Sequence, residues 1–173
     1  YKRQVQDNVY DYIIGNPPYL KIPKDADEAR VMPSICYGAP NLYFLFWAMG
    51  IHNLKEGHEL VYIVPRSWTS GAYFKKFREY FFKNCVITDM HLFESRDKVF
   101  EGESVLQETV IVKVKKTTAT PEYINITSSS TSQFTDLKTF RAPYATVVAR
   151  NQFVYLVTNE ADAAVLSLIN RFD

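Results

Sequence analysis

Residues 9–19 of this chain read VYDYIIGNPPY, an apolar run followed at once by a glycine, an asparagine and two prolines. A short, continuous apolar run is typical of a strand that lies buried in a parallel sheet. Pro17 and Pro18 end such a strand, because proline has a fixed φ and no N–H to donate. The two prolines alone fit plain chain termination as well as a functional turn.

Asn16 favours the functional interpretation. A residue that precedes proline is held in an extended conformation, which aims its side chain and the next carbonyl in fixed directions. Tyr19 adds a flat apolar face beside these two acceptors. The stretch therefore predicts a pocket for a planar group that carries an NH2, and the exocyclic amine of a nucleobase fits that description.

Length and composition are those of one globular domain. The 173 residues are 47% hydrophobic and 23% charged, which is enough apolar material for a sizeable core. The formal net charge is only +1, so the chain lacks the strongly basic composition of many nucleic-acid-binding domains. Any nucleic-acid contact must rest on a local patch or on parts of the protein outside this chain.

Disulfide, metal and membrane proteins are not expected from this sequence. Cys36 and Cys85 lie far apart without CxxC spacing, and the three histidines form no HExxH motif. No apolar run reaches the ~18 residues of a membrane span, and no signal-peptide pattern is present. We therefore expect a cytoplasmic protein without a metal site. Because the first strand follows Tyr1 so closely, we also expect a piece of a longer polypeptide.

The hydrophobic pattern predicts alternating strands and helices, which is the arrangement of a parallel sheet with covering helices. Asn41 is a good N-cap for the first helix, in which Leu42, Leu45, Phe46, Met49 and Leu54 are expected to form the buried face. Residues 20–40 have little periodicity and are expected to form a substrate-facing loop. The expected strands are 9–14, 60–64 and 86–92, and the expected helices are 41–54 and about 71–83.

The second half of the chain has a different hydrophobic pattern and composition. Residues 107–115 alternate valine with wetter positions, which predicts a strand near an edge, antiparallel to the strand before it. Residues 117–121 and 127–132 have linker composition, with a short strand expected at 123–126. A further strand is expected at 153–157. Asn159 then caps a last helix whose apolar face should lean on the main body or on an absent domain: Ala161, Val165, Leu168, Ile169 and Phe172.

Three segments carry a resemblance to a known family: DYIIGNPPY at 11–19, LVYIVPRSW at 60–68 and VFEGESVLQETVIVKVKK at 99–116. Together they resemble the DNA methyltransferases of restriction–modification systems that methylate N6 of adenine, with the chain beginning just before their NPPY motif. The resemblance implies an α/β fold, the C-terminal part of a Rossmann-like class I methyltransferase sheet with an antiparallel last strand and a short α+β extension. Residues 1–116 would be a partial catalytic domain, and 117–173 a linker and extension toward a target-recognition region.

The same resemblance implies a catalytic group of Asn16, Pro17 and Tyr19. The amide oxygen of Asn16 and the carbonyl of Pro17 would accept hydrogen bonds from the adenine amine and stabilise its more tetrahedral transition state. Tyr19 would stack on the flipped base. Phe100 matches the aromatic residue that covers the other face of the base, and Phe93 is its rival for this role.

Three further residues are expected to bind substrate: Pro18, Lys21 and Arg66. Arg66 follows a predicted strand at the active-site end, a position that suits contact with a DNA phosphate. A solvated rim without contact to DNA remains the alternative for this residue.

The resemblance also implies S-adenosyl-L-methionine as the cofactor and double-stranded DNA as the partner in a bacterial or archaeal cytoplasm, with a target-recognition domain or subunit downstream. In this family the cofactor-binding motifs precede NPPY, so no cofactor-binding residue can be assigned here. Two alternatives stay open. One is an NPPY methyltransferase acting on a protein glutamine or an RNA base amine, and the other is a non-catalytic DNA-binding or scaffold domain.

Overall fold

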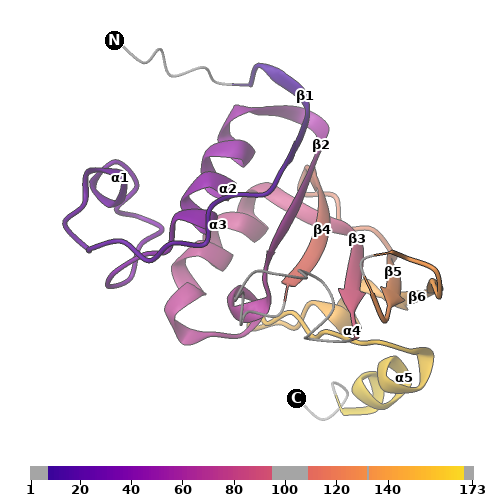
Figure 1. The fold of residues 1–173 in the computed structure, drawn as a ribbon. Helices are drawn as coiled ribbons and strands as arrows, with labels where there is room; N and C mark the ends of the chain where they lie inside the picture. Colours follow the sequence, from indigo (N-terminus) through magenta and orange to yellow (C-terminus); the bar gives the residue numbers. More distant parts are fainter. Residues whose placement is uncertain (1–7, 95–108, 132, 170–173) are drawn as a thin grey trace.

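The computed structural model describes residues 8–94, 109–131 and 133–169. All of its strands belong to one six-stranded sheet with the order β1-β2-β4-β3-β5-β6 (Figure 1). Two 3-10 turns, η1 (Arg66–Thr69) and η2 (Ala72–Phe74), follow β2. The strands and helices are β1 (Tyr10–Gly15), α1 (Asp27–Arg30), α2 (Leu42–Asn53), β2 (Leu54–Pro65), α3 (Lys75–Asn84), β3 (Cys85–Phe93), β4 (Thr109–Lys116), β5 (Tyr123–Ser129), β6 (Lys138–Pro143), α4 (Tyr144–Val147) and α5 (Glu160–Ile169).

The strand directions place four carboxyl ends together. β1 is parallel to β2, β3 is parallel to β5, and β4 runs antiparallel to both β2 and β3. The carboxyl ends of β1, β2, β3 and β5 therefore share one end of the sheet, which we call the carboxyl edge. This arrangement confirms the predicted α/β class and the antiparallel pairing of the valine-rich strand.

The prediction that the valine-rich strand lies near an edge of the sheet is wrong, because β4 lies between β2 and β3. Lys115 is exposed, but Lys113 forms ion pairs with both neighbouring strands. The Nζ atom of Lys113 lies 2.8 Å from a carboxylate oxygen of Asp89 on β3 and 3.6 Å from one of Glu59 on β2. Cross-strand ion pairs on a central strand thus produce the same sequence alternation as an edge.

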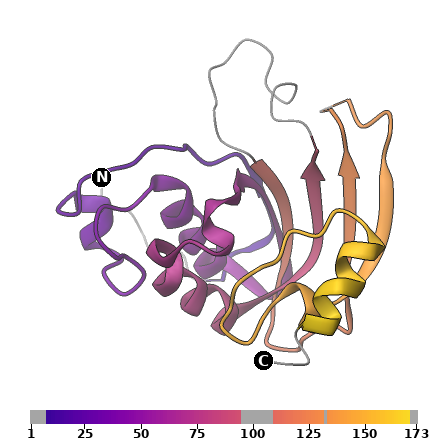
Figure 2. The ribbon, with the colours of Figure 1, turned by 90° about the horizontal axis from the view of Figure 1, so that it is seen from below.

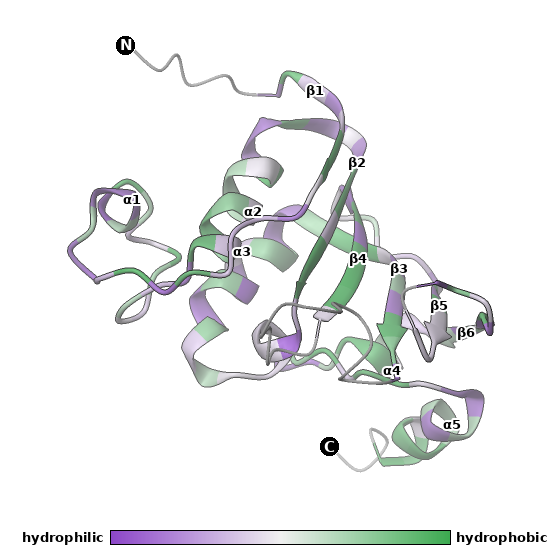
Figure 3. Ribbon diagram, in the orientation of Figure 1, coloured by the Kyte–Doolittle hydropathy of each residue, from purple (hydrophilic) through white to green (hydrophobic). Residues whose placement is uncertain are grey.

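The core lies on one face of the sheet, where α2 and α3 pack side by side (Figures 1 and 2). Hydrophobic residues are concentrated in β2 and β4 (Figure 3). Aromatic rings fill the space between helices and sheet, with the Trp47 ring centroid 4.9 Å from that of Trp68 and 5.1 Å from that of Phe81. Edge-on and tilted ring pairs of this kind favour one packing arrangement over others.

Helix α2 has the predicted position, but only part of the expected face is buried. The side chain of Asn41 accepts a hydrogen bond from the backbone N–H of Tyr43 at 3.2 Å, which confirms the N-cap. Phe46 and Met49, expected in the core, are 39% and 41% exposed, whereas Trp47 is fully buried. Because the helix is hydrophobic nearly all round, periodicity could not select its buried side.

The C-terminal region corrects two expectations. Residues 127–129, predicted as linker, lie in β5 and pair with β3. The strand expected at 153–157 is reduced to a single bridge between Val148 and Val154. Helix α5 is capped by Asn159 as predicted, and its buried position is Ala163. The described part of its expected apolar face, Ala161, Val165, Leu168 and Ile169, is exposed, and Phe172 lies outside the described residues. The division into 1–116 and 117–173 stays a prediction, and the sheet continues across it.

Arg78 joins α3 to the turn after β2. Its side chain is 1% exposed, and its Nη1 donates to the carbonyls of Trp68 at 2.9 Å and Gly71 at 2.8 Å. The guanidinium also lies over the ring of Phe153, 5.0 Å from the centroid. Burial lowers the pKa of Arg78. A buried charge held by backbone carbonyls fixes the turn η1 against the C-terminal segment.

Replacing Arg78 should therefore destabilise the chain. Arg78→Met removes both charge-assisted hydrogen bonds, each of which is worth about 1.5–3 kcal/mol, and leaves buried carbonyls without a partner. We expect urea unfolding to shift to a lower midpoint with little change in slope. Glu79→Gln, an exposed neighbour, is the control and should stay within about 0.5 kcal/mol of wild type. An equally small effect of Arg78→Met would contradict the assigned role.

Candidate active site

The GNPPY segment leaves β1 at the carboxyl edge, directly beside the end of β2. Gly15 pairs in register with Tyr62, and a Cβ atom on Gly15 would lie 3.1 Å from the Tyr62 ring. A side chain at this position would press on that ring, so glycine permits the close approach of the two strands. In the turn that follows, Pro17 is buried, whereas Asn16 and Pro18 are exposed. The turn is thus anchored through Pro17 and presents Asn16 to the outside.

Tyr19 is held at both ends of its side chain. Its hydroxyl donates to the carbonyl of Ile63 on β2 at 2.9 Å. Its ring packs edge-on against the ring of Tyr43 on α2, with centroids 6.2 Å apart and planes at 85°. Burial raises the pKa of Tyr19 to about 12, so the phenol stays neutral near pH 7. Tyr43 is buried, and its hydroxyl lies 3.2 Å from Oγ of Ser67 in η1.

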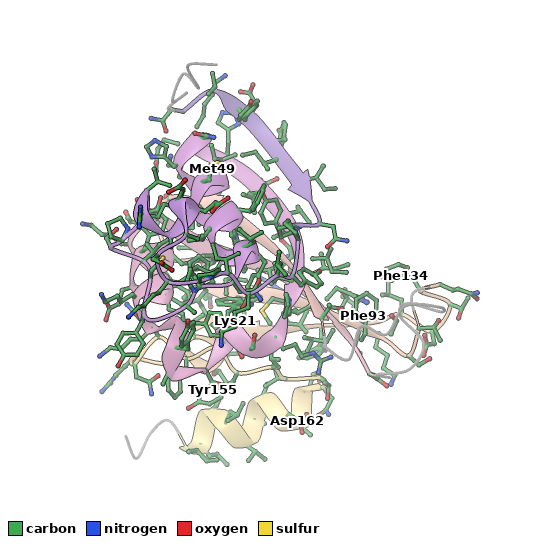
Figure 4. The ribbon with its side chains drawn as sticks, turned by 60° about the vertical axis from the view of Figure 1, so that its left-hand side comes forward. Lys21, Met49, Phe93, Phe134, Tyr155 and Asp162 are labelled. Carbon is green, nitrogen blue, oxygen red and sulfur yellow. The ribbon has the colours of Figure 1, made fainter. Side chains whose placement is uncertain are left out.

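The loop at 20–40 is closed at its base. The backbone N–H of Leu42 donates to the carbonyl of Leu20, and that of Ile22 donates to the carbonyl of Pro40, both at 2.8 Å. Lys21 forms an isolated antiparallel bridge with Asn41, and its side chain is exposed (Figure 4). The GNPPY segment is therefore joined to the first turn of α2. The loop itself is confirmed, and its substrate-facing role stays a prediction.

Arg66 lies at the carboxyl edge, but its guanidinium is turned toward the backbone. Nε donates to the carbonyl of Thr109 at 3.2 Å, and Nη2 donates to the carbonyl of Phe93. The Phe93 ring is buried and lies next to Phe134, with centroids 6.0 Å apart (Figure 4). Phe100 lies outside the described residues. The structure thus brings Asn16, Pro17, Pro18 and Tyr19 together, with Lys21 adjacent in the chain.

The sequence analysis missed a polar cluster around His91. Its Nδ1 lies 2.8 Å from Oγ1 of Thr127, and its Nε2 lies 3.1 Å from Oγ of Ser129. Because the Ser129 hydroxyl donates to the carbonyl of Thr131, its oxygen accepts from Nε2–H of His91. Burial lowers the pKa of His91. The only signal was a pair of hydroxyl residues at a spacing of two, within a stretch whose composition suggested a linker.

The described residues contain neither a candidate metal-binding cluster nor a candidate membrane-spanning helix. They contain no group of three or more histidine, cysteine, aspartate or glutamate side chains that could hold a metal ion. In the same part of the chain, no helix is long and apolar enough to cross a membrane.

The domain has a mixed sheet with an internal antiparallel strand, and an asparagine–proline–proline–tyrosine turn lies at the carboxyl edge. This is the architecture of a methyltransferase-type α/β domain. The model of the Eco57I restriction-modification methylase family matches residues 2–100, and the chain belongs to this family. The family assignment in the sequence analysis is confirmed.

Two relatives cover most of the chain. The type II methyltransferase M.BsuBI of Bacillus subtilis is 34% identical over 90% of this chain and 32% of its own length. The type II methyltransferase M.PstI of Providencia stuartii is 35% identical over 88% of this chain and 31% of its own length. The chain therefore spans about a third of the length of these relatives.

Solved structures share the fold at low sequence identity. The type IIG restriction endonuclease BpuSI superposes with a TM-score of 0.63 and 18% identity, over 83% of this chain and 20% of the other. A type I restriction-modification methyltransferase subunit from Streptococcus thermophilus superposes with a TM-score of 0.54 and 14% identity, over 99% of this chain and 34% of the other. A candidate class I S-adenosylmethionine-dependent methyltransferase from Listeria monocytogenes superposes with a TM-score of 0.56 and 22% identity, over 75% of this chain and 39% of the other.

The anchoring of Tyr19 predicts a pH-dependent difference between wild type and Tyr19→Phe. Near pH 7 the variant should be less stable by about 1 kcal/mol, because the hydrogen bond to Ile63 is lost. The pKa of Tyr19 is raised to about 12, so its stabilisation is complete below pH 10 and is lost as pH rises toward 12. The difference should therefore shrink over this range.

Urea denaturation at a series of pH values measures this effect. Tyr37→Phe, at an exposed tyrosine, is the matched control and should change stability by less than about 0.5 kcal/mol at pH 7. A Tyr19→Phe variant as stable as wild type at pH 7 would show that the hydroxyl does not anchor the ring.

Proposed function

We propose that this chain is the base-binding part of a DNA methyltransferase that methylates N6 of a flipped adenine in a restriction–modification or phage-defence system. The observation that carries the proposal is the GNPPY turn, with Pro17 buried and Asn16 exposed at the carboxyl edge. Membership of a restriction-modification methylase family and the names of M.BsuBI and M.PstI support DNA as the substrate.

The proposed chemistry uses two fixed acceptors. The lone pair of the adenine amine is delocalised into the ring, and the amine becomes tetrahedral and positively charged as it forms the new N–CH3 bond. Oδ1 of Asn16 and the carbonyl oxygen of Pro17 accept hydrogen bonds from its two N–H groups and stabilise that charge. No general base is required, because the methylated ammonium is acidic enough to lose a proton to water. The anchored ring of Tyr19 stacks on the flipped base.

S-adenosyl-L-methionine is the proposed methyl donor and would supply an activated methyl group. The described residues do not fit its binding site. Gly38 has a positive φ, but a Cβ there would lie 3.0 Å from the Tyr73 ring, and a Cβ on Gly15 would meet Tyr62. Neither of these glycines forms an open turn that could approach a ligand. Gly57 has a positive φ and open space around it, but it lies near the start of β2, at the opposite end of that strand from the carboxyl edge. The residues that hold the cofactor are therefore not assigned to this chain.

The proposed protein also contains more than this chain. β1 is an outer strand of the sheet, and on one face it exposes Tyr12 and Ile14, with fractions of 74% and 85%. Apolar side chains on an outer strand favour cover by another part of the polypeptide. A target-recognition domain or subunit would add sequence specificity in a cytoplasmic enzyme that acts on double-stranded DNA.

The chain alone should consequently have no methyltransferase activity. With labelled S-adenosyl-L-methionine and adenine-containing duplex DNA, we expect no label in the DNA, because the cofactor-binding residues are missing. Incorporation of label by this chain alone would contradict the proposal that the cofactor site lies elsewhere in the protein.

Asn16 gives the sharpest test in the full-length protein. Asn16→Ala removes one acceptor and should lower the single-turnover rate by ~10² to 10³, by analogy with loss of one oxyanion-hole donor. Folding should be unaffected, because the side chain is exposed. Asn16→Asp retains an acceptor oxygen at the same position and should keep more activity than Asn16→Ala.

The site of methylation distinguishes DNA adenine from the other substrates. A glutamine amide or an RNA base amine would offer the same NH2 to Asn16. Mass spectrometry of the product should find N6-methyladenine in digested DNA. Methylglutamine in a protein, or methylated RNA without methylated DNA, would replace the proposal, and an unchanged rate in Asn16→Ala would remove the role of Asn16.

A further inference from the structure

Arg66 offers hydrogen bonds to two strands that begin and end next to it. Phe93, whose carbonyl accepts from Nη2, is the last residue of β3, and Thr109, whose carbonyl accepts from Nε at 3.2 Å, is the first residue of β4. Pro65 faces Thr109 in the ladder and has no N–H to donate. The next residue, Arg66, supplies a side-chain donor to the Thr109 carbonyl.

The turn that carries Arg66 also supports Tyr19. Oγ of Ser67 lies 3.2 Å from the hydroxyl of Tyr43, and the rings of Tyr43 and Tyr19 form a T-shaped pair. Behind the turn, Arg78 binds the carbonyl of Trp68. A shift of η1 would thus be passed to the GNPPY segment through the Tyr43 ring.

We propose that Arg66 is a positioning residue, whose guanidinium holds the ends of β2, β3 and β4 together at the carboxyl edge instead of binding a DNA phosphate. The inference rests on the proposed methyltransferase function and revises one residue of it. The planar guanidinium can reach two carbonyls at once, which a lysine ammonium on the same stem cannot do with the same geometry. If Arg66 turned outward to a phosphate, the carbonyls of Phe93 and Thr109 would lose these donors.

Salt dependence separates the two roles. Each phosphate contact adds about 0.9 to the slope of log K against log salt concentration. In the full-length protein, we expect Arg66→Gln to leave the DNA affinity and this slope at wild-type values. The same variant should lower kcat about tenfold or more, because small misplacements of catalytic groups are costly. Arg66→Lys should not restore kcat, although it keeps the charge.

The control is Lys83→Gln, which removes one positive charge from the last turn of α3, before β3 begins and away from the carboxyl edge. It should leave the slope and kcat unchanged. A slope that falls by about 0.9 in Arg66→Gln and recovers in Arg66→Lys would overturn the positioning role and assign Arg66 to a phosphate.

Hydrogen–deuterium exchange of the full-length protein supplies a readout that does not depend on activity. Arg66→Gln should accelerate exchange in the described ends of β3 and β4, around Leu92 and Val110, and leave β5 and β6 at wild-type rates. Unchanged hydrogen–deuterium exchange at the ends of β3 and β4 would contradict the positioning role of Arg66. If the wild-type full-length protein methylates no DNA, the proposed function fails, while the exchange result still decides what Arg66 holds.

Discussion

The parallel pairing of β1 with β2 is the constraint on which the site depends. It brings the end of β1, where GNPPY begins, next to the end of β2, where η1 begins. Gly15 makes the approach close enough for the Tyr62 ring to lie against it. The Tyr19 hydroxyl can then reach the carbonyl of Ile63 on the neighbouring strand. A polar turn and a pinned aromatic ring are fixed by one strand pair.

The turn η1 connects the GNPPY segment to the ends of the other strands. On one side, Ser67 contacts Tyr43 and so lies behind Tyr19, and on the other side Arg66 reaches the ends of β3 and β4. Arg78 binds the carbonyl of Trp68 in the same turn and that of Gly71 just after it. Hydrogen bonds to backbone carbonyls are well suited to this purpose, because they fix the main chain itself. Preorganised acceptors are what the proposed reaction requires.

The local sequence was sufficient for the turn and for most elements, because prolines, an N-cap asparagine and short apolar runs act within a few residues. It failed where a long-range partner decides the outcome. Lys113 reads as a solvated position until Asp89 and Glu59 are placed on either side of it. The composition of residues 127–129 suggests a linker, and only the structure shows that the hydroxyls of Thr127 and Ser129 contact His91. For Arg66, the carbonyl partners become visible only once three strands are assembled.

A structure of the full-length protein bound to duplex DNA that contains its target adenine tests the central claim most directly. The account predicts a flipped adenine whose N6 lies about 2.7–3.2 Å from both Oδ1 of Asn16 and the carbonyl oxygen of Pro17, with Tyr19 stacked on the base. An adenine that stays in the duplex, or an extruded base whose amine contacts other residues, would contradict it.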